Sequence, residues 1–313
     1  MIKFIKEEKS KLLKLFQIKK ISILFLILNS FVYAKSFDIA EKIQKNGIVY
    51  RKGEEKAFTG AFTGDGIYEE YKDGIKNGKF IGKVTIEENI YNYEGVYIEG
   101  VKNGEWRIRY PDGKIKAILN YNYDLPRGQW TYFYENNQIK GYENFNNGVI
   151  YGESIFYQEN GNILKRGTYK NGLIDGELVL YRKNHNLDSI VNFSVGNLDG
   201  KIEVYSQNNI LQLQGSYKNN KRDNLWKLYY NNGDLKMIVS YSHGLKNGRM
   251  VIYGKAGEIV QTTIYKDNNE IDNTGQIILK GPAEVEDNIA NRYQKLVYSF
   301  EYMKYNKALN DLK

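Results

Sequence analysis

The residue types that most often carry enzyme chemistry are scarce in this chain of 313 residues. It has no cysteine and only two histidines, His185 and His243, which fall in different kinds of predicted turn. With so few nitrogen and sulfur ligands we expect no metal centre and no cofactor. His185 lies near Asp188 and Ser189, the residue types of a nucleophilic triad. All three fall within five residues of one predicted hairpin, however, which is not how a triad is usually assembled.

Carboxylates recur near the start of predicted strands, at Glu105, Glu153, Glu177 and Glu203. A sugar-cleaving pair needs two carboxylates in one cleft, but an active site occurs once, so recurrence favours a solvated face. Each Gly-x-x-x-Gly segment leads into a predicted strand, whereas phosphate and dinucleotide loops lead into a helix. The sequence therefore predicts that the protein is not an enzyme.

The elements that would position any site are set by a turn signal with a period of 24 residues. Glycine, asparagine and aspartate adopt positive φ angles at little cost, so a regular ladder of them predicts one tight turn built repeatedly. The ladder has two positions in each repeat. The first comprises Gly100, Asp124, Gly148, Gly172, Gly196, Asn220, Gly244 and Asn268, and the second comprises Gly104, Gly128, Gly152, Gly176, Gly200, Asn224 and Gly248.

Apolar columns with the same period predict two strands in each repeat. An aromatic column comprises Tyr97, Tyr121, Phe145, Tyr169, Phe193, Tyr217, Tyr241 and Tyr265, and an aliphatic column comprises Ile115, Ile139, Ile163, Leu187, Leu211, Leu235 and Ile259. Apolar residues two apart indicate strands with one buried face, and eight Asn-Gly dipeptides indicate hairpins. We expect an all-β fold, an elongated, twisted antiparallel sheet of stacked hairpins with both columns in its core.

The two ends of the chain differ from the repeats. Residues 1–34 have a lysine-rich stretch, about a dozen mostly apolar residues and Val-Tyr-Ala, the order of a signal peptide cleaved after Ala34. The alternative is an uncleaved N-terminal anchor in the inner membrane. We predict a cap and a degenerate first repeat over 35–66 and the repeats over 67–275. An amphipathic helix is predicted over 282–313; it would cap the sheet edge, bind a partner or associate with a membrane.

The net charge of +8 is concentrated in the signal segment, where seven lysines and two glutamates account for +5. The rest of the chain has 38 basic and 35 acidic residues without a run of like charges. This balance argues against a nucleic-acid partner.

The repeat resembles the MORN repeat at Tyr169–Glu177 and at Tyr241–Gly248. It is closest to the bacterial variant at Gly104–Tyr110 and Gly128–Tyr134, where Gly-x-Trp-x-x-x-Tyr follows the turn. Such proteins are often identified as toxin–antitoxin system antitoxins of the YwqK family. The resemblance covers about residues 50–272 and implies a non-catalytic scaffold that binds proteins or phospholipid head groups.

Residues where the repeat varies are the candidates for binding: Trp106, Arg109, Tyr110, Trp130, Tyr134, Trp226 and Tyr230. We predict an exported scaffold, periplasmic, on the outer surface or extracellular, that binds a protein partner at the cell envelope. Two alternatives are a module that binds carbohydrate or cell wall through exposed Tyr and Trp, and an antitoxin-like neutraliser of a toxin. The sequence does not predict the oligomeric state.

Overall fold

The computed structural model describes residues 35–283 and 286–310, so the predicted signal segment lies outside the described residues. The chain divides into two compact units. The first runs to Gly82 and includes Tyr97–Gly100, and the second comprises Lys83–Val96 and the chain from Val101 onward.

The first unit is a small β structure around an aromatic core. Its elements are β1 (Ser36–Asp38), the short 3-10 helix η1 (Ile39–Glu41), β2 (Lys42–Lys45), β3 (Ile48–Arg51), β4 (Gly60–Gly64), β5 (Ile67–Lys72) and the first part of β6 (Ile75–Ile86). β1 pairs with β4 in parallel, and β4 pairs with β5 in antiparallel fashion. Phe58 stacks on Phe62 with ring centroids 4.2 Å apart, and Val49 and Tyr71 complete the buried cluster.

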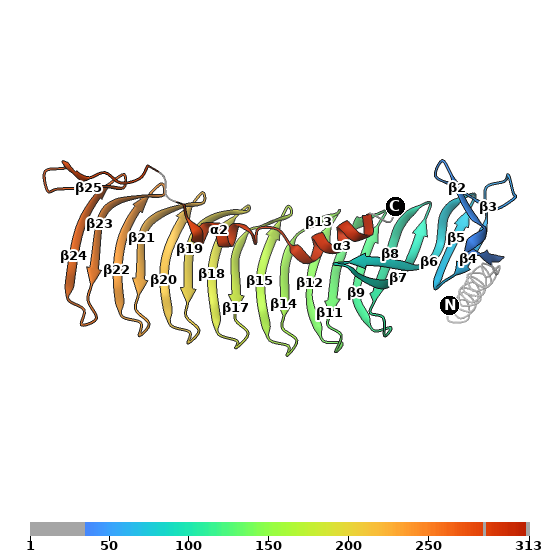
Figure 1. Cartoon of the computed structure of the whole chain (residues 1–313), viewed down its shortest axis with the longest axis horizontal. Coiled ribbons are helices and arrows are strands. Elements are labelled where there is room, and N and C mark those ends of the chain that lie inside the picture. The colour runs from blue at the N-terminus through green and yellow to red at the C-terminus, as the bar shows by residue number, and fades with distance from the viewer. Residues whose placement is uncertain (1–34, 284–285, 311–313) are drawn as a thin grey trace, which may run out of the picture. The chain divides into compact units, whose positions relative to one another are not determined.

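The second unit is a long antiparallel sheet in which each strand pairs with a neighbour along the chain, in three places past a strand of two residues (Figure 1). It contains the rest of β6 and most of β7 (Asn89–Ile98). The following strands are β8 (Val101–Arg109), β9 (Ile115–Asn122), β10 (Leu125–Pro126), β11 (Gly128–Phe133), β12 (Ile139–Asn146), β13 (Val149–Ile150), β14 (Gly152–Tyr157), β15 (Ile163–Lys170), β16 (Leu173–Ile174), β17 (Gly176–Tyr181) and β18 (Leu187–Ser194). The last are β19 (Asn197–Tyr205), β20 (Leu211–Lys218), β21 (Lys221–Tyr229), β22 (Leu235–Ser242), β23 (Leu245–Tyr253), β24 (Ile259–Lys266), β25 (Asn269–Ile271) and β26 (Ile277–Leu279). The predicted all-β fold of consecutive hairpins is confirmed.

The two positions of the turn ladder both adopt positive φ angles, but they belong to different structural features. Between β18 and β19, Val195 and Gly196 have φ angles of 45° and 78°, the two consecutive positive values of a type I′ hairpin turn. Gly200, at φ 106°, lies inside β19, where the register with β18 shifts. The first position is therefore the turn and the second is a bulge, so the Gly-x-x-x-Gly segment is itself part of a hairpin.

One face of the second unit's sheet carries the core. From Tyr121 to Tyr217 the predicted aromatic column is buried, as predicted, whereas Tyr241 and Tyr265 are half-buried. The aliphatic column is not core: Leu187 is half-buried, and Ile139 and Ile259 are 46% and 59% exposed. The register shifts just before each of these residues, as between Leu180 and Tyr181, and this bulge takes the column out of the buried row.

The C-terminal segment forms two short helices, α2 (Asn288–Gln294) and α3 (Phe300–Asn310), which run across the strands (Figure 1). We call residues 286–310 the strap. Tyr302 packs on Trp130 and Phe145, and Tyr305 packs on Tyr132, with ring centroids 4.9–5.6 Å apart. The strap therefore covers the core-bearing face.

The prediction of one helix that caps the terminal edge was wrong on both counts. The helical segment is interrupted at 295–299, and the last strand, β26, keeps Ile277, Ile278 and Leu279 at least 60% exposed. Tyr302 and Tyr305 pack on aromatic rings of the broad face of the sheet instead of on this edge. Within residues 35–283 and 286–310, no helix has the length and apolar character that a membrane crossing requires.

Candidate functional site

The three tryptophans predicted to form a binding surface are core residues. Trp106, Trp130 and Trp226 are at most 1% exposed. Trp130 donates its indole N–H to the carbonyl of Asn120 at 2.9 Å, and Trp226 donates to the carbonyl of Ser216 at 3.1 Å. They occupy the inward position of the strand alternation, beside the aromatic column, so they cannot stack on a ligand without unfolding of the sheet.

The predicted tyrosines tie each repeat to the next one. The hydroxyls of Tyr110, Tyr134 and Tyr230 each donate to a backbone carbonyl in the following hairpin at 2.7–2.8 Å. Tyr110 is 6% exposed, and burial, followed by the charge of Glu135, raises its pKa to about 12. The expected exposure of Tyr110 was therefore wrong, and the other two are half-buried.

Arg109, the remaining candidate, is held by a carboxylate. Its Nε and Nη2 donate to Glu94 at 2.9 and 2.6 Å. Both side chains are about 30% exposed. Arg109 is thus an ion-pair partner within the second unit, and the structure does not gather it with the tyrosines into one site.

Polar residues that the sequence analysis did not select lie beneath the strap. Glu143 has no exposed surface, and it accepts hydrogen bonds from the hydroxyls of Tyr132 and Ser299. Burial raises its pKa although these hydrogen bonds lower it. Lys165 is largely buried, with its ammonium 4.4 Å from the ring centroid of Phe156, and burial lowers its pKa. An otherwise apolar face therefore contains charged groups that water reaches poorly.

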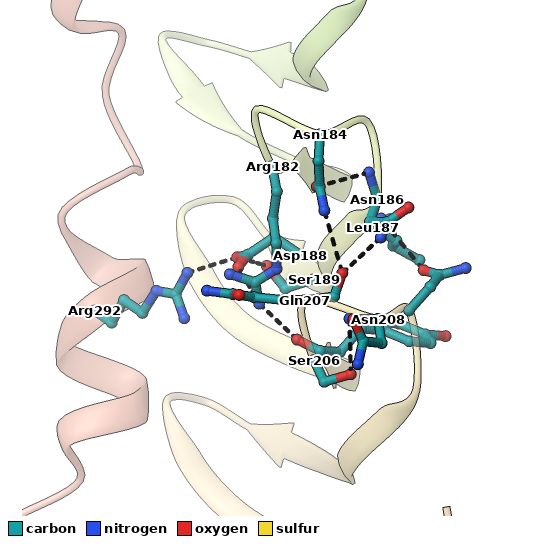
Figure 2. Close-up of polar contacts among 12 residues, drawn as sticks. Arg182, Asn184, Asn186, Leu187, Asp188, Ser189, Ser206, Gln207, Asn208 and Arg292 are labelled. Atoms are coloured by element: carbon teal, nitrogen blue, oxygen red, sulfur yellow. Dashed lines mark hydrogen bonds and ion pairs between the residues drawn. The ribbon is translucent and has the colours of Figure 1, made fainter. Parts of the chain in front are cut away.

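Asp188 joins three separate elements through its carboxylate. Its side chain is 9% exposed, and it binds Arg182 of the same hairpin at 2.7 Å and Arg292 of α2 at 2.5 Å. Figure 2 shows Arg292 reaching Asp188 from the helix, with Arg182 beside the same carboxylate. Arg182 also donates to the carbonyl of Tyr205 in the next hairpin at 2.6 Å. The arrangement fixes α2 to the sheet.

These groups line a cleft of about 660 Å³ between the sheet and α2. Its lining residues comprise four cations, one carboxylate and two amides among others: Lys165, Arg182, Lys183, Arg292, Asp188, Asn184 and Gln207. The Nε of Arg182 is buried and finds no hydrogen-bond acceptor among the described residues. Arg182 was detectable in the sequence, since it replaces tyrosine in the column of Tyr110, Tyr134 and Tyr230. Arg292 on α2, which shares the carboxylate of Asp188 with Arg182, could not be found from the repeat pattern.

The face opposite the strap presents a continuous row of aromatic and aliphatic side chains, which we call the aromatic stripe. Each aromatic residue pairs across its hairpin with a member of the aliphatic column, and paired positions share a face. The pairs are Phe133 with Ile139, Tyr157 with Ile163, Tyr181 with Leu187, Tyr205 with Leu211, Tyr229 with Leu235 and Tyr253 with Ile259. All twelve are half-buried or exposed.

No group of three or more His, Cys, Asp and Glu residues that could hold a metal ion occurs in the described part of the chain. The two histidines also stay apart: His185 contacts Asn162 in a neighbouring turn, and His243 contacts Ser242. His185 therefore makes no nucleophilic triad with Ser189, whose hydroxyl donates to Asp188 at 3.1 Å.

Comparison with known proteins matches the repeats. A family model described as the MORN repeat variant matches residues 102–123, 126–147, 150–171, 198–219 and 222–243. No curated protein matches the sequence. Among solved structures, the chain is similar to one described as "Crystal structure of GtfA/B complex bound to UDP and GlcNAc", with 12% identity and a TM-score of 0.17. That match covers 37% of this chain and spans 22% of the other, and at this TM-score it carries no argument about fold or function.

Proposed function

We propose that this chain is a non-catalytic scaffold of MORN-type repeats, which the family model matches over residues 102–243 in five segments, and that its aromatic stripe binds a protein partner. The stripe carries the proposal because the two faces of the sheet differ. The strap covers one face with Tyr302 and Tyr305, whereas Tyr181 and Tyr205 on the other face are only half-buried.

The composition of the stripe supports a protein partner. Tyrosine is enriched at protein interfaces because it buries a large apolar ring while its hydroxyl keeps a hydrogen bond. In the stripe, Tyr205 donates its hydroxyl to Glu203 at 3.0 Å. Successive tyrosines in equivalent strands are two strand spacings apart, roughly 9.5 Å, so an extended partner would meet the same side chain once in each repeat.

We also propose that the partner is met at the cell envelope, after export by the segment 1–34. The support for this step is the order of basic, apolar and small residues in that segment. Fractionation of cells followed by sequencing of the mature N-terminus tests it. A chain that starts at Lys35 in an envelope fraction agrees with the proposal, and full-length protein confined to the cytoplasm contradicts it.

Binding by the stripe is tested with the full chain and two double variants. The stripe variant carries Tyr181→Ala and Tyr205→Ala, and the control carries Thr168→Ala and Asn192→Ala in β15 and β18. Proteins retained from envelope extract by the wild type and the control, but not by the stripe variant, are then purified and their binding is measured directly. If every retained protein still binds the stripe variant, with its fold verified by thermal unfolding, the stripe is not the interface. Retention of glycans instead of proteins would favour the carbohydrate alternative.

A further inference from the structure

The cleft beside α2 has more positive charge than its own carboxylate balances. Lys165, Arg182, Lys183 and Arg292 line the cleft together with one carboxylate, Asp188. The carboxylates of Glu143 and Glu301 act on Lys165 from outside this lining. Arg182 and Arg292 each give Asp188 one short contact. The lining therefore keeps a net charge of +3, which is unusual in a chain whose described surface is otherwise close to neutral.

Two of these cations still have donor capacity in the cleft. The buried Nε of Arg182 has no acceptor among the described residues. Lys165 packs over the ring of Phe156 and is in no ion pair within the described part of the chain. A buried donor without an acceptor costs free energy, so an acceptor that enters the cleft would be stabilised by a hydrogen bond from Arg182 and by the charge of Lys165.

We propose that this cleft binds an acidic segment of the partner protein, whose carboxylates contact Lys165, Arg182 and Lys183. The inference rests on the proposed function, because it assigns a chemistry to the partner of the aromatic stripe. The stripe lies on the face opposite the strap and the cleft lies on the strap side, and Tyr181 of the stripe is also one of the residues that line the cleft.

The structure itself shows that the cleft suits carboxylates. Asp188 is bound there by two guanidinium groups in charge-assisted contacts of 2.5 and 2.7 Å. Gln207 in the lining supplies an amide group that can bind a peptide backbone, whereas the amide of Asn184 already bonds to the backbone of Gln207 and Asn186. Binding of one carboxylate would leave the cleft with a net charge of +2. A segment with several carboxylates therefore balances the charge of the cleft better than a segment with one.

The test measures binding of a labelled Asp- and Glu-rich peptide to the full chain by fluorescence anisotropy. A peptide of equal length with Asn and Gln, and inorganic phosphate as competitor, are measured in parallel. We expect saturable binding of the acidic peptide alone, weakened as salt screens the charges. Displacement of the peptide by millimolar phosphate, or equal binding of the neutral peptide, would overturn the proposal.

Two variants locate the binding, and a third is the control. Lys165→Gln should weaken it about tenfold, equivalent to about 1.4 kcal/mol, because a hydrogen bond to a buried charge is lost. Lys183→Gln, at an exposed position where misfolding is not expected, should weaken it about two- to fivefold. Lys170→Gln removes the same charge from an exposed site on the same strand as Lys165 and should change nothing. Equal affinities for all three variants would overturn the assignment.

The failure of this inference can be told apart from failure of the proposed function. If the stripe variant loses its partner while Lys165→Gln and Lys183→Gln retain it at full affinity, the stripe is an interface and the cleft is not part of it. If the acidic peptide binds in the cleft but no partner depends on the stripe, the proposed function is wrong and the cleft stands as a separate site.

Discussion

Gly215 lies against the indole of Trp226, and a methyl group there would have no room. An added Cβ would be 2.3 Å from Cδ2 and 2.5 Å from Cε2 of Trp226, whereas carbon atoms in contact lie about 3.5–4.0 Å apart. The ring cannot move away easily, because its N–H is bonded to the carbonyl of Ser216 and Arg222 lies 4.4 Å from its centroid. The substitution Gly215→Ala should therefore destabilise the second unit.

The expected loss is about 1–3 kcal/mol, the usual cost of overpacking a well-packed core. Gly215 does not adopt a positive φ angle, so backbone strain adds nothing, and the methyl group itself would otherwise stabilise slightly through the unfolded chain. For a domain of 150–250 residues each kcal/mol lowers Tm by about 2–4 °C. We therefore expect a decrease of about 2–12 °C.

Gly167 supplies a matched control at the equivalent position two repeats earlier. There an added Cβ meets the terminal methyl groups of Ile174 at 3.1 Å and Leu178 at 3.3 Å, which flexible side chains can move by a few tenths of an ångström. Gly167→Ala should change stability by less than about 1 kcal/mol. Thermal unfolding followed by circular dichroism compares the two variants. Equal Tm values would refute the packing of Trp226 on Gly215.

Three further predictions concern charge and turn geometry. Burial raises the pKa of Glu143 despite the hydrogen bond from Ser299, so the protonated carboxyl stabilises the fold and this stabilisation is lost as pH rises through the folded-state pKa. Glu143→Gln should therefore raise Tm at neutral pH, and a lower Tm would contradict this reasoning. Although burial alone raises the pKa of Asp287, Arg222 lowers it overall. Their ion pair therefore stabilises the fold above the unfolded-state pKa, and this stabilisation is lost in acid. Arg222→Ala should lower the free energy of unfolding by about 1–3 kcal/mol at neutral pH in urea titrations, and by less in acid. Gly176 has a φ angle of 101°, so Gly176→Val should cost about 1–2 kcal/mol or more, and an unchanged Tm would mean that the assigned bulge is wrong.

The repeated fold could be predicted because its determinants are local. A positive φ angle at Gly172 or Gly196 depends on residue type and neighbouring backbone, and strand alternation depends on residues two apart. The bulge at Gly200 was missed, since turns and bulges use the same positive φ angles and only the register of β18 against β19 distinguishes them.

The candidate sites were predicted less well, because exposure is a property of the assembled sheet. Trp130 and Tyr110 varied between repeats, and variation suggested a surface role, yet both are buried. The column of Leu187 did not vary in type and was assigned to the core, yet Leu187 is only half-buried beside Tyr181. Residue type alone could not tell which of two adjacent apolar columns faces the strap.

The sequence by itself determined the period and the hairpins, because these follow from residue type and short-range spacing. Only the tertiary structure decided that the C-terminal segment crosses the face of the sheet and that Asp188 meets Arg292, 104 residues away in the chain. Contacts at such separations arise when apolar faces pack together, and the ion pairs form where that packing places opposite charges. The cleft and the free aromatic stripe both result from where the strap lies.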